Sequence, residues 1–452
     1  MPEVPAVSRV AAAFAPDGAL ARALPDFEPR AGQAAMAAAV ARVFERGGVL
    51  LAEAGTGTGK TLAYLVPALL HGERVLISTG TKNLQEQIYF KDIPALRDAL
   101  DVRFTAAYMK GRANYLCLHK LDQLNDGIST AAHDVFLPTI REWSRRTTTG
   151  DRAELTDLPE DVGFWNEVAA TAETCLGTEC PRYTDCFVTR MRQQAAAADV
   201  VIVNHHLLCA DAAVRQNNFG EVIPACSRAI LDEAHQLEDV ATQYFGHSVS
   251  NHRLEELARD AERLASRAIG DRKDKDDVER VVERLRDTAR GFFTDLAFAH
   301  RAASASGRPE PVDGRGGGRG RGEERVRATA GSLADAHDAA SLLIGALDLF
   351  ESTFALLTTV RLKPDTSADG EQSSGGVRLQ PDRYRDEDRP EDFAVLVTRA
   401  AALRDELRFL LRGSDEGYVY FVEFRGRGIF LRASPIDVSA IIHGVLLDKM
   451  RT

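Results

Sequence analysis

The feature that most constrains the fold is the glycine-rich segment Ala54-Gly55-Thr56-Gly57-Thr58-Gly59-Lys60-Thr61. An apolar run at Val49–Ala52 precedes it, and apolar residues at helical spacing follow it from Leu62 to Leu69. Glycines let backbone N–H groups wrap around phosphates, and the N-terminus of the next helix favours negative charge. A strand, this loop and a helix in that order predict a phosphate-binding loop rather than a simple glycine- and threonine-rich turn.

Lys60 is predicted to reach the β- and γ-phosphates of a bound nucleoside triphosphate, and Thr61 is predicted to bind Mg²⁺. The other loop residues predicted to contact the nucleotide are Gly55, Thr56, Gly57, Thr58 and Gly59. Ala54 stands at the first loop position, where the usual motif has glycine, which is a small departure.

A second motif, Asp232-Glu233-Ala234-His235, follows the apolar run Ala229–Leu231. This order places carboxylates at the C-terminal end of a buried strand, where open α/β sheets bind their ligands. Asp232 is predicted to hold Mg²⁺ through a water, and Glu233 to polarise the attacking water. An Asp-Glu pair alone is more simply a solvated helix start, but its position after a phosphate-binding loop favours a shared nucleotide site.

Short apolar runs alternate with helical periodicity, which predicts an α/β fold with a parallel sheet and crossover helices. The expected strands are Val49–Ala52, Val75–Thr79, Phe104–Tyr108, Val200–Val203 and Ala229–Leu231. About 90 residues separate the third and fourth strands, which is too long for a plain connection and predicts an inserted domain.

The pattern changes to amphipathic helix after residue 250, which predicts a second, helical insertion. Within it, residues 307–327 and 363–389 are too polar or too rich in Gly and Arg to pack, so we expect mobile loops there. The runs Tyr418–Phe424 and Gly428–Arg432 predict a hairpin that returns the chain to the parallel sheet.

Four of the six cysteines, Cys117, Cys175, Cys180 and Cys186, fall in the first insertion. Fifty-seven, four and five residues separate consecutive members. Four thiolates can hold a [4Fe–4S] cluster or a structural Zn²⁺, and gaps wider than those of zinc knuckles favour the cluster. Cys209 and Cys226 are expected to be buried apolar residues.

The net charge of −11 argues against a protein that coats duplex DNA through bulk charge, although a local basic groove remains compatible with it. No apolar run reaches the length needed to cross a bilayer, and the N-terminus is a poor match to a secretory signal. We therefore expect a cytoplasmic protein without a membrane partner.

Taken in order, the motifs resemble the first motor domain of the XPD/DinG family of superfamily 2 iron–sulfur DNA helicases, and most of all its bacterial DinG/YoaA branch. The resemblance runs from about residue 10 to about residue 245. It rests on Phe27–Gln33, Glu53–Thr61, Ser78–Thr81 with Leu84, Gln85 and Gln87, Lys110–Arg112 with Asn114, Tyr115 and Cys117, Val203–Leu207, and Asp232–His235.

The resemblance implies a RecA-like motor domain with two insertions. Motor-domain residues are then 1–109, 196–245 and 416–452, a [4Fe–4S] insertion spans 110–195, and an arch-like helical insertion spans 246–415. Gln33, with Arg30, would select adenine and hence ATP, because an amide can pair with a donor and an acceptor together. Contacts with the backbone of single-stranded DNA would come from Thr79, Thr81, Lys110 and Arg112. For the two threonines, capping of a strand end is an equally simple role.

The function implied by the resemblance is ATP-dependent DNA unwinding in the 5′-to-3′ direction, in DNA repair or replication, with single-stranded or forked DNA as the partner. The family's second motor domain carries a Ser/Thr-Ala-Thr motif and arginine fingers, and neither is found in these 452 residues. The alternative is therefore a module that binds nucleotide and single-stranded DNA with little turnover. The sequence identifies no protein partner.

Overall fold

The computed structural model describes residues 6–24, 27–55, 57–125, 131–156, 158–159, 164–171, 174–216, 221–306, 323–360 and 390–444. The chain divides into two compact units. The first comprises Met1–Ala172, Cys180–Phe245 and Asp437–Thr452, and the second comprises Glu173–Glu179 and Gly246–Ile436.

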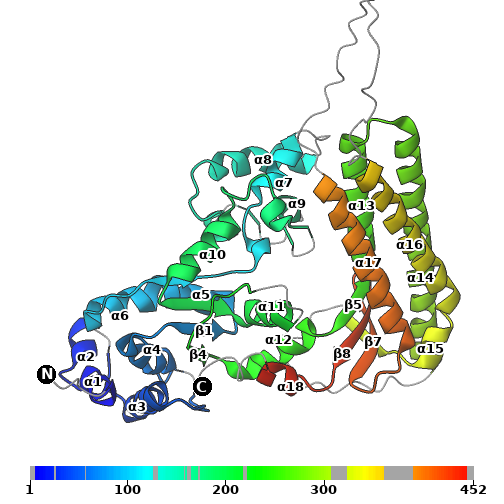
Figure 1. The fold of residues 1–452 in the computed structure, drawn as a ribbon. Helices are drawn as coiled ribbons and strands as arrows, with labels where there is room; N and C mark the ends of the chain where they lie inside the picture. The colour runs from blue at the N-terminus through cyan, green and yellow to red at the C-terminus, as the bar shows by residue number, and fades with distance from the viewer. Residues whose placement is uncertain are drawn as a thin grey trace, which may run out of the picture. The chain divides into compact units, whose positions relative to one another are not determined.

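The first unit is built on a parallel sheet, as the sequence predicts, and this sheet has four of the five expected strands (Figure 1). Its strand order is β2-β3-β1-β4, where β1 is Val75–Thr79, β2 is Ala106–Tyr108, β3 is Val200–Asn204 and β4 is Arg228–Leu231. The α-helices of this unit are α1 (Ala6–Ala13), α2 (Ala19–Ala23), α3 (Ala31–Arg46), α4 (Lys60–His71), α5 (Lys82–Gln87), α6 (Ile93–Leu100), α7 (Leu118–Asn125), α8 (Ala131–Ser144), α9 (Trp165–Val168), α10 (Phe187–Ala197), α11 (His205–Gln216), α12 (Leu237–Tyr244) and α18 (Ser439–Ile442). A π-helical turn covers Ile88–Asp92, and 3₁₀ turns cover Arg112–Asn114, Arg152–Glu154 and Ala234–Gln236.

The two faces of this sheet bury different apolar layers, because successive residues of a strand point to opposite faces. Val75 and Ile77 of β1 pack in one core with α1, α3, α4 and α6. Leu76 of β1 and Val201 of β3 pack in another core with α10, α11, α12 and the segment between β2 and β3. Both central strands are buried along their whole length, which explains their continuous apolar sequence.

One predicted strand, Val49–Ala52, is wrong. The segment forms neither a helix nor a strand, and Val49 and Leu51 are 60% and 92% exposed. Gly47 and Gly48, with φ of 78° and 106°, turn the chain at the end of α3. Positive φ at two consecutive glycines redirects the backbone, so an apolar run by itself did not decide pairing.

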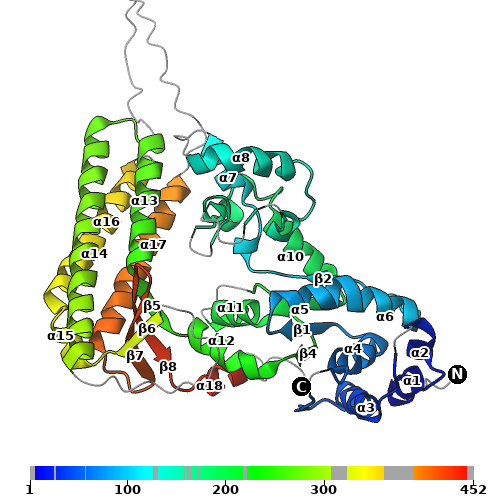
Figure 2. The same ribbon diagram turned by 180° about the vertical axis from the view of Figure 1, so that it is seen from behind.

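The second unit combines an antiparallel sheet with long helices that lie side by side (Figures 1 and 2). The sheet has the order β5-β8-β7-β6, with β5 at His247–Ser250, β6 at Glu323–Arg327, β7 at Tyr418–Arg425 and β8 at Gly428–Pro435. The helices are α13 (Asn251–Ala268), α14 (Arg272–Ser306), α15 (Ala330–Ala334), α16 (His337–Val360) and α17 (Pro390–Arg412), with a 3₁₀ turn at Gly177–Glu179. The predicted helical pattern after residue 250 is confirmed by the buried faces of α13 and α14.

Two predictions for this unit need correction. The hairpin of β7 and β8 forms, but it pairs with β5 and β6 and so does not join the parallel sheet, and the expected boundary at 415/416 is wrong. The expected loop 307–327 is wrong over Glu323–Arg327, which forms β6 because it finds a partner in β7. Residues 307–322 and 363–389 lie outside the described residues.

Among the described helices, one segment of α16, His337–Thr358, is long and apolar enough to cross a membrane by length and composition. A third of its most apolar window is buried, and α16 packs against α14 and α17. Core helices of folded domains pass the same test, so this is weak evidence for a membrane segment.

Candidate functional site

The glycine-rich loop lies against the start of α3. The backbone at Gly57 and Gly59 has φ of 74° and 81°, a left-handed conformation that favours glycine. Nε2 of Gln33 donates to the carbonyl of Gly59 at 2.9 Å, and a Cβ at Gly59 would come within 2.1 Å of that nitrogen. Nη1 of Arg30 donates to the carbonyl of Gly57. Gln33 and Arg30 therefore fix the loop, while Thr56 lies outside the described residues.

Lys60, the first residue of α4, meets the acidic motif that follows β4. Its Nζ donates to Oε1 of Glu233 at 2.9 Å, and the two side chains are 25% and 26% exposed. The backbone N–H of Asp232 donates to the carbonyl of Ser78 at 2.8 Å, which continues the pairing of β4 with β1. Glu233 itself adopts a left-handed backbone with φ of 54°, a strained conformation that often marks functional sites. The lysine and the carboxylates thus converge as the sequence predicts.

Tyr64 is a site residue that the sequence analysis missed. Its hydroxyl donates to Oδ2 of Asp232 at 3.2 Å. Tyr64 lies one helical turn after Lys60, so a search for polar residues at i+4 on this helix face could have found it. Burial raises the pKa of Asp232, and the hydrogen bond from Tyr64 opposes that rise.

The electrostatics of the site favour a charged Lys60–Glu233 pair. The hydrogen bond to Glu233 raises the pKa of Lys60, and the same bond lowers the pKa of Glu233.

Nδ1 of His205 lies 2.7 Å from Oγ of Ser78, and burial lowers the pKa of His205. His205, the first residue of α11, is therefore a buried residue that contacts β1.

The oxygen donors of Thr61 and Asp232 are of the kind that Mg²⁺ prefers. Both residues lie beside Lys60 and Tyr64, whose hydroxyl interacts with each of them. This donor set fits the predicted magnesium site.

A cavity of about 320 Å³ lies beside the loop. It combines apolar side chains with one amide, one guanidinium and one carboxylate group, a lining suited to a flat heterocycle that carries polar groups. The lining residues are Leu24, Phe27, Glu28, Arg30, Gln33, Gly59 and Leu62. The predicted adenine-reading residues thus border the same cavity as the loop.

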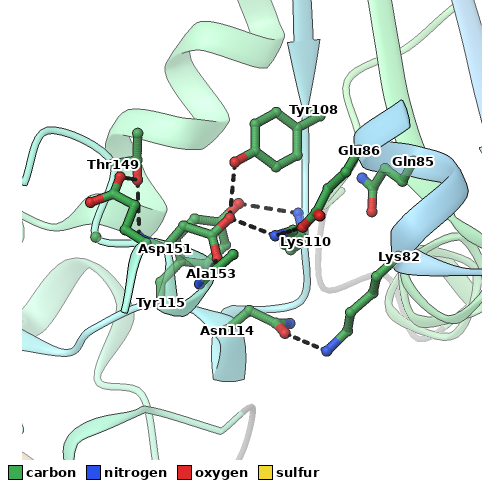
Figure 3. A network of polar contacts seen from close by, with 12 residues as sticks. Lys82, Gln85, Glu86, Tyr108, Lys110, Asn114, Tyr115, Thr149, Asp151 and Ala153 are labelled. Atoms are coloured by element: carbon green, nitrogen blue, oxygen red, sulfur yellow. Dashed lines mark hydrogen bonds and ion pairs between the residues drawn. The ribbon is translucent and has the colours of Figure 1, made fainter. Parts of the chain in front are cut away.

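Lys110, predicted as a DNA contact, is instead buried in a polar network (Figure 3). Its Nζ lies 2.7 Å from Oδ2 of Asp151 and 2.7 Å from Oε1 of Glu86. Oδ2 of Asp151 also accepts a hydrogen bond from the hydroxyl of Tyr108 at 2.9 Å. Because its side chain is only 3% exposed and two carboxylates neutralise it, Lys110 does not present its charge to a strand of DNA. The sequence prediction for this residue therefore needs correction.

The other predicted DNA contacts differ in exposure. Thr79 is fully buried, and its hydroxyl donates to the carbonyl of Thr81 at 2.9 Å. Thr81 is exposed and caps α5, where its hydroxyl accepts from the N–H of Leu84. Arg112 is half-buried in a 3₁₀ turn. The capping role of Thr81 is thus present, and Thr81 and Arg112 are the two predicted contacts that reach the surface.

The four predicted cluster ligands are partly exposed and form no disulfide. In the part of the chain that the structure describes, which includes all four, no three His, Cys, Asp or Glu side chains are gathered to hold a metal ion. Cys175 belongs to the second unit and the other three cysteines belong to the first, so the cluster stays a prediction from the sequence. Cys209 is buried as predicted, and burial raises the pKa of its thiol to about 12.

A phosphate-binding loop that faces a carboxylate pair at the end of a parallel sheet defines a P-loop nucleotide-binding α/β domain. Within that class, residues 31–130 match the DEAD/DEAH box helicase family. The match includes the loop and Lys60, while the Asp232–His235 motif lies beyond it.

Curated relatives agree with this match. The chain is 46% identical over 287 residues to the ATP-dependent DNA helicase YoaA of Escherichia coli (strain K12), which covers 63% of this chain and 44% of that protein. It is 46% identical over 258 residues to YoaA of Haemophilus influenzae, covering 56% and 40%, and 38% identical over 269 residues to the ATP-dependent helicase DinG of Mycobacterium tuberculosis (strain H37Rv), covering 54% and 40%.

A solved structure described as truncated XPD matches 92% of this chain and 90% of its own, at 13% identity and a TM-score of 0.37. The resemblance to DinG- and YoaA-type helicases that the motifs indicate is thus confirmed by the sequence relatives. The chain spans less than half the length of the curated relatives it matches.

Proposed function

We propose that this chain is the ATP-binding part of an ATP-driven DNA helicase that moves 5′-to-3′ on single-stranded or forked DNA. The observation that carries the proposal is the 2.9 Å contact between Lys60 of the phosphate-binding loop and Glu233 of the acidic motif, with Asp232 beside it. The similarity to helicases of the DinG and YoaA type supports it. A cytoplasmic location and a role in DNA repair or replication belong to the same proposal.

The Lys60–Glu233 pair gives the site a way to respond to ATP. The phosphates of ATP offer Lys60 negative charge in place of Glu233, and a partly exposed ion pair is worth only about 0–1 kcal/mol, so the exchange costs little. Glu233 is then free to accept a proton from the attacking water. Thr61 and Asp232 would hold Mg²⁺, which neutralises charge on the phosphates.

The second candidate is a module that binds nucleotide and single-stranded DNA with little turnover. It needs only the phosphate-binding loop and surface residues such as Thr81 and Arg112. Turnover also needs positive charge at the γ-phosphate, and arginines in that role contribute about 10³ to 10⁵ in rate to related phosphoryl transfers.

ATP hydrolysis with and without single-stranded DNA separates the two candidates. DNA-stimulated turnover that Lys60→Ala abolishes supports the helicase proposal. The matched control is Lys91→Ala, which removes an exposed lysine of the same unit and should leave turnover unchanged. Binding of ATP and DNA without turnover supports the module, and failure to bind ATP contradicts both.

We keep a [4Fe–4S] cluster on Cys117, Cys175, Cys180 and Cys186 as a sequence hypothesis. It rests on the four cysteines and the family resemblance, and the described geometry adds no support. Iron analysis and visible absorbance of the purified chain test it, because iron–thiolate clusters are coloured and zinc is not. Iron that is lost in Cys180→Ser supports the cluster, whereas zinc or no metal contradicts it.

A further inference from the structure

Among the described residues, two side-chain contacts of different character join α4 to the acidic motif. Lys60 and Glu233 form a partly exposed ion pair, with side chains 25% and 26% exposed. Tyr64 is only 3% exposed, and its hydroxyl donates to Oδ2 of Asp232 at 3.2 Å. The first contact can exchange its partners with ions from solvent, whereas the second is enclosed by the protein.

The ring of Tyr64 belongs to the apolar core on one face of the parallel sheet. This core also contains residues of α1, α3 and α6, and Val75 and Ile77 of β1. Core side chains are close-packed and held in defined rotamers, so the hydroxyl of Tyr64 has a fixed position. That position is beside the C-terminal end of β4, where Asp232 follows the strand. Tyr64 is therefore placed to hold a carboxylate of the nucleotide site still.

The groups around the Tyr64 hydroxyl determine the direction of each hydrogen bond. A tyrosine hydroxyl carries one proton at neutral pH, and an ionised carboxylate can only accept. The proton of Tyr64 therefore goes to Asp232, and the hydroxyl oxygen of Tyr64 is left as an acceptor. Its second partner is Thr61, so the hydroxyl of Thr61 donates to Tyr64. The lone pairs of the Thr61 oxygen then stay available for a cation.

Fixed ligand oxygens matter more for Mg²⁺ than for larger divalent cations. Mg²⁺ demands near-octahedral geometry with oxygens at about 2.0–2.1 Å, while Ca²⁺ accepts six to eight oxygens at about 2.3–2.6 Å in flexible arrangements. Groups that hydrogen-bond metal ligands change metal affinity by about 10- to 100-fold. A buried hydroxyl that bonds both Thr61 and Asp232 is a group of this kind.

We propose that Tyr64 is a positioning residue for the nucleotide-bound magnesium ion, whose hydroxyl orients Thr61 and Asp232 and so favours Mg²⁺ over Ca²⁺. The inference rests on the ATP-binding part of the proposed function and adds a residue that determines the preferred cation. It also gives the two contacts of α4 separate roles. When phosphates draw Lys60 away from Glu233, the bond from Tyr64 keeps Asp232 in place.

The test measures how the 452-residue chain binds an ATP analogue that carries a fluorescent N-methylanthraniloyl group on its ribose. Affinity is measured in EDTA and in titrations with Mg²⁺ and with Ca²⁺. Tyr64→Phe keeps the ring in the core and removes only the hydroxyl, so its affinity in EDTA should stay within about twofold of wild type. The Mg²⁺ concentration that gives half of the gain in affinity should rise about tenfold or more. For Ca²⁺ the rise should be at most about threefold, because Ca²⁺ tolerates less ordered ligands.

Tyr115→Phe is the matched control in the same unit. Tyr115 is also 3% exposed, and its hydroxyl also makes a 3.2 Å hydrogen bond, which it accepts from the backbone N–H of Lys110. Its ring lies in the core on the other face of the sheet. This control should leave the Mg²⁺ dependence unchanged. Tyr64→Met, a second variant without the hydroxyl, fills the space with a flexible apolar chain and should show the same shift for Mg²⁺ as Tyr64→Phe.

The outcomes separate this inference from the proposed function. If the wild-type chain gains affinity from Mg²⁺ and Tyr64→Phe needs no more Mg²⁺ than wild type, the inference is wrong and the proposed function stands. An equal loss in EDTA, an equal rise for Mg²⁺ and Ca²⁺, or the same loss in Tyr115→Phe would each overturn it as well. If the wild-type chain does not bind the analogue, the ATP-binding part of the proposed function fails and the inference fails with it. Thermal unfolding of each variant checks that losses of binding are not losses of fold.

Discussion

The first unit contains two lysine–carboxylate pairs of nearly the same length in very different surroundings. Lys60 and Glu233 are 2.9 Å apart, with side chains 25% and 26% exposed. Lys110 and Asp151 are 2.7 Å apart, with side chains 3% and 2% exposed. Distance alone therefore does not distinguish them, and burial decides what each pair can do.

Burial matters because it decides whether water or another ion can replace the partner of each charged side chain. When the Lys60 pair separates, water or a phosphate can replace either partner at little cost. When the Lys110 pair separates, each charge is left in a poorly solvated interior, which costs several kcal/mol. We therefore interpret the first pair as exchangeable and functional, and the second as a structural link. The link joins β2, α5 and the segment that holds Asp151 (Figure 3).

The largest expected effect is on the buried pair. Lys110→Met should destabilise the first unit by about 3–5 kcal/mol, because it leaves Asp151 and Glu86 without their shared cation. Thermal and denaturant unfolding can be followed by tryptophan fluorescence, since Trp143 and Trp165, the two tryptophans of the chain, lie in the same core. Replacing the partner too, in Lys110→Met with Asp151→Leu, should cost less than the sum of the single changes.

A loss below about 1 kcal/mol in Lys110→Met would contradict the structural interpretation. It would mean that the pair behaves like an exposed one, and that Lys110 could exchange its partners for DNA phosphates after all.

The next effect is on the exchangeable pair and concerns rate. Lys60→Ala should lower ATP hydrolysis by about 10²- to 10³-fold, the scale seen when one donor to a developing charge is removed. The free energy of unfolding of the Lys60→Ala variant should differ from that of the wild type by no more than about 1 kcal/mol. Measuring ATP turnover and unfolding for both Lys60→Ala and Lys110→Met tests whether the two pairs differ in this way. A stability loss in Lys60→Ala as large as in Lys110→Met would remove the distinction between the pairs.

The two lysines also show how far sequence reasoning reaches. The position of Lys60 beside the acidic motif was predictable because its neighbours in the chain, glycines before it and a helix after it, determine its surroundings. Asp232 and Glu233 were found because an apolar strand ends directly before them. The role of Lys110 was not predictable in this way, because its partner Asp151 lies 41 residues further on and no local pattern links them.

The same limit applies to the sheets. The buried strands β1 and β3 were visible as continuous apolar runs. Val49–Ala52 is also apolar, yet it forms no strand, and two glycines with positive φ precede it. The hairpin of β7 and β8 was predicted from its own residues, but its partner β6 follows a Gly- and Arg-rich stretch that gives no strand signal. Local sequence therefore predicts where a strand forms, whereas its pairing partner depends on residues far away in the chain.

The third prediction concerns the loop that carries Lys60. Gly59→Ala should destabilise the first unit by about 1–3 kcal/mol, because the backbone is left-handed there and the new Cβ would meet Nε2 of Gln33. Gly55→Ala is the matched control, since its Cβ would lie 3.8 Å from Cγ2 of Thr58, an ordinary contact. Unfolding measurements on both variants test whether the loop that carries Lys60 is rigid. Equal stability of the two variants would argue that the loop is free to rearrange.

The smallest expected effect is the pH dependence of the exchangeable pair. The hydrogen bond from Lys60 lowers the pKa of Glu233 below its usual 4.5, so this carboxylate stabilises the fold above that pH and loses its contribution as the pH falls through the folded-state pKa. The same bond raises the pKa of Lys60 above 10.5, so the lysine contributes fully below that pH and loses its contribution as the pH rises through the folded-state pKa.

Wild type and Lys60→Met should therefore differ in unfolding free energy by a constant amount, at most about 1 kcal/mol, between about pH 5 and 10. That difference should shrink on both sides of this window. A difference that grows as the pH falls would show that Glu233 is not held by Lys60, and the proposed exchange with the phosphates of ATP would lose its starting state.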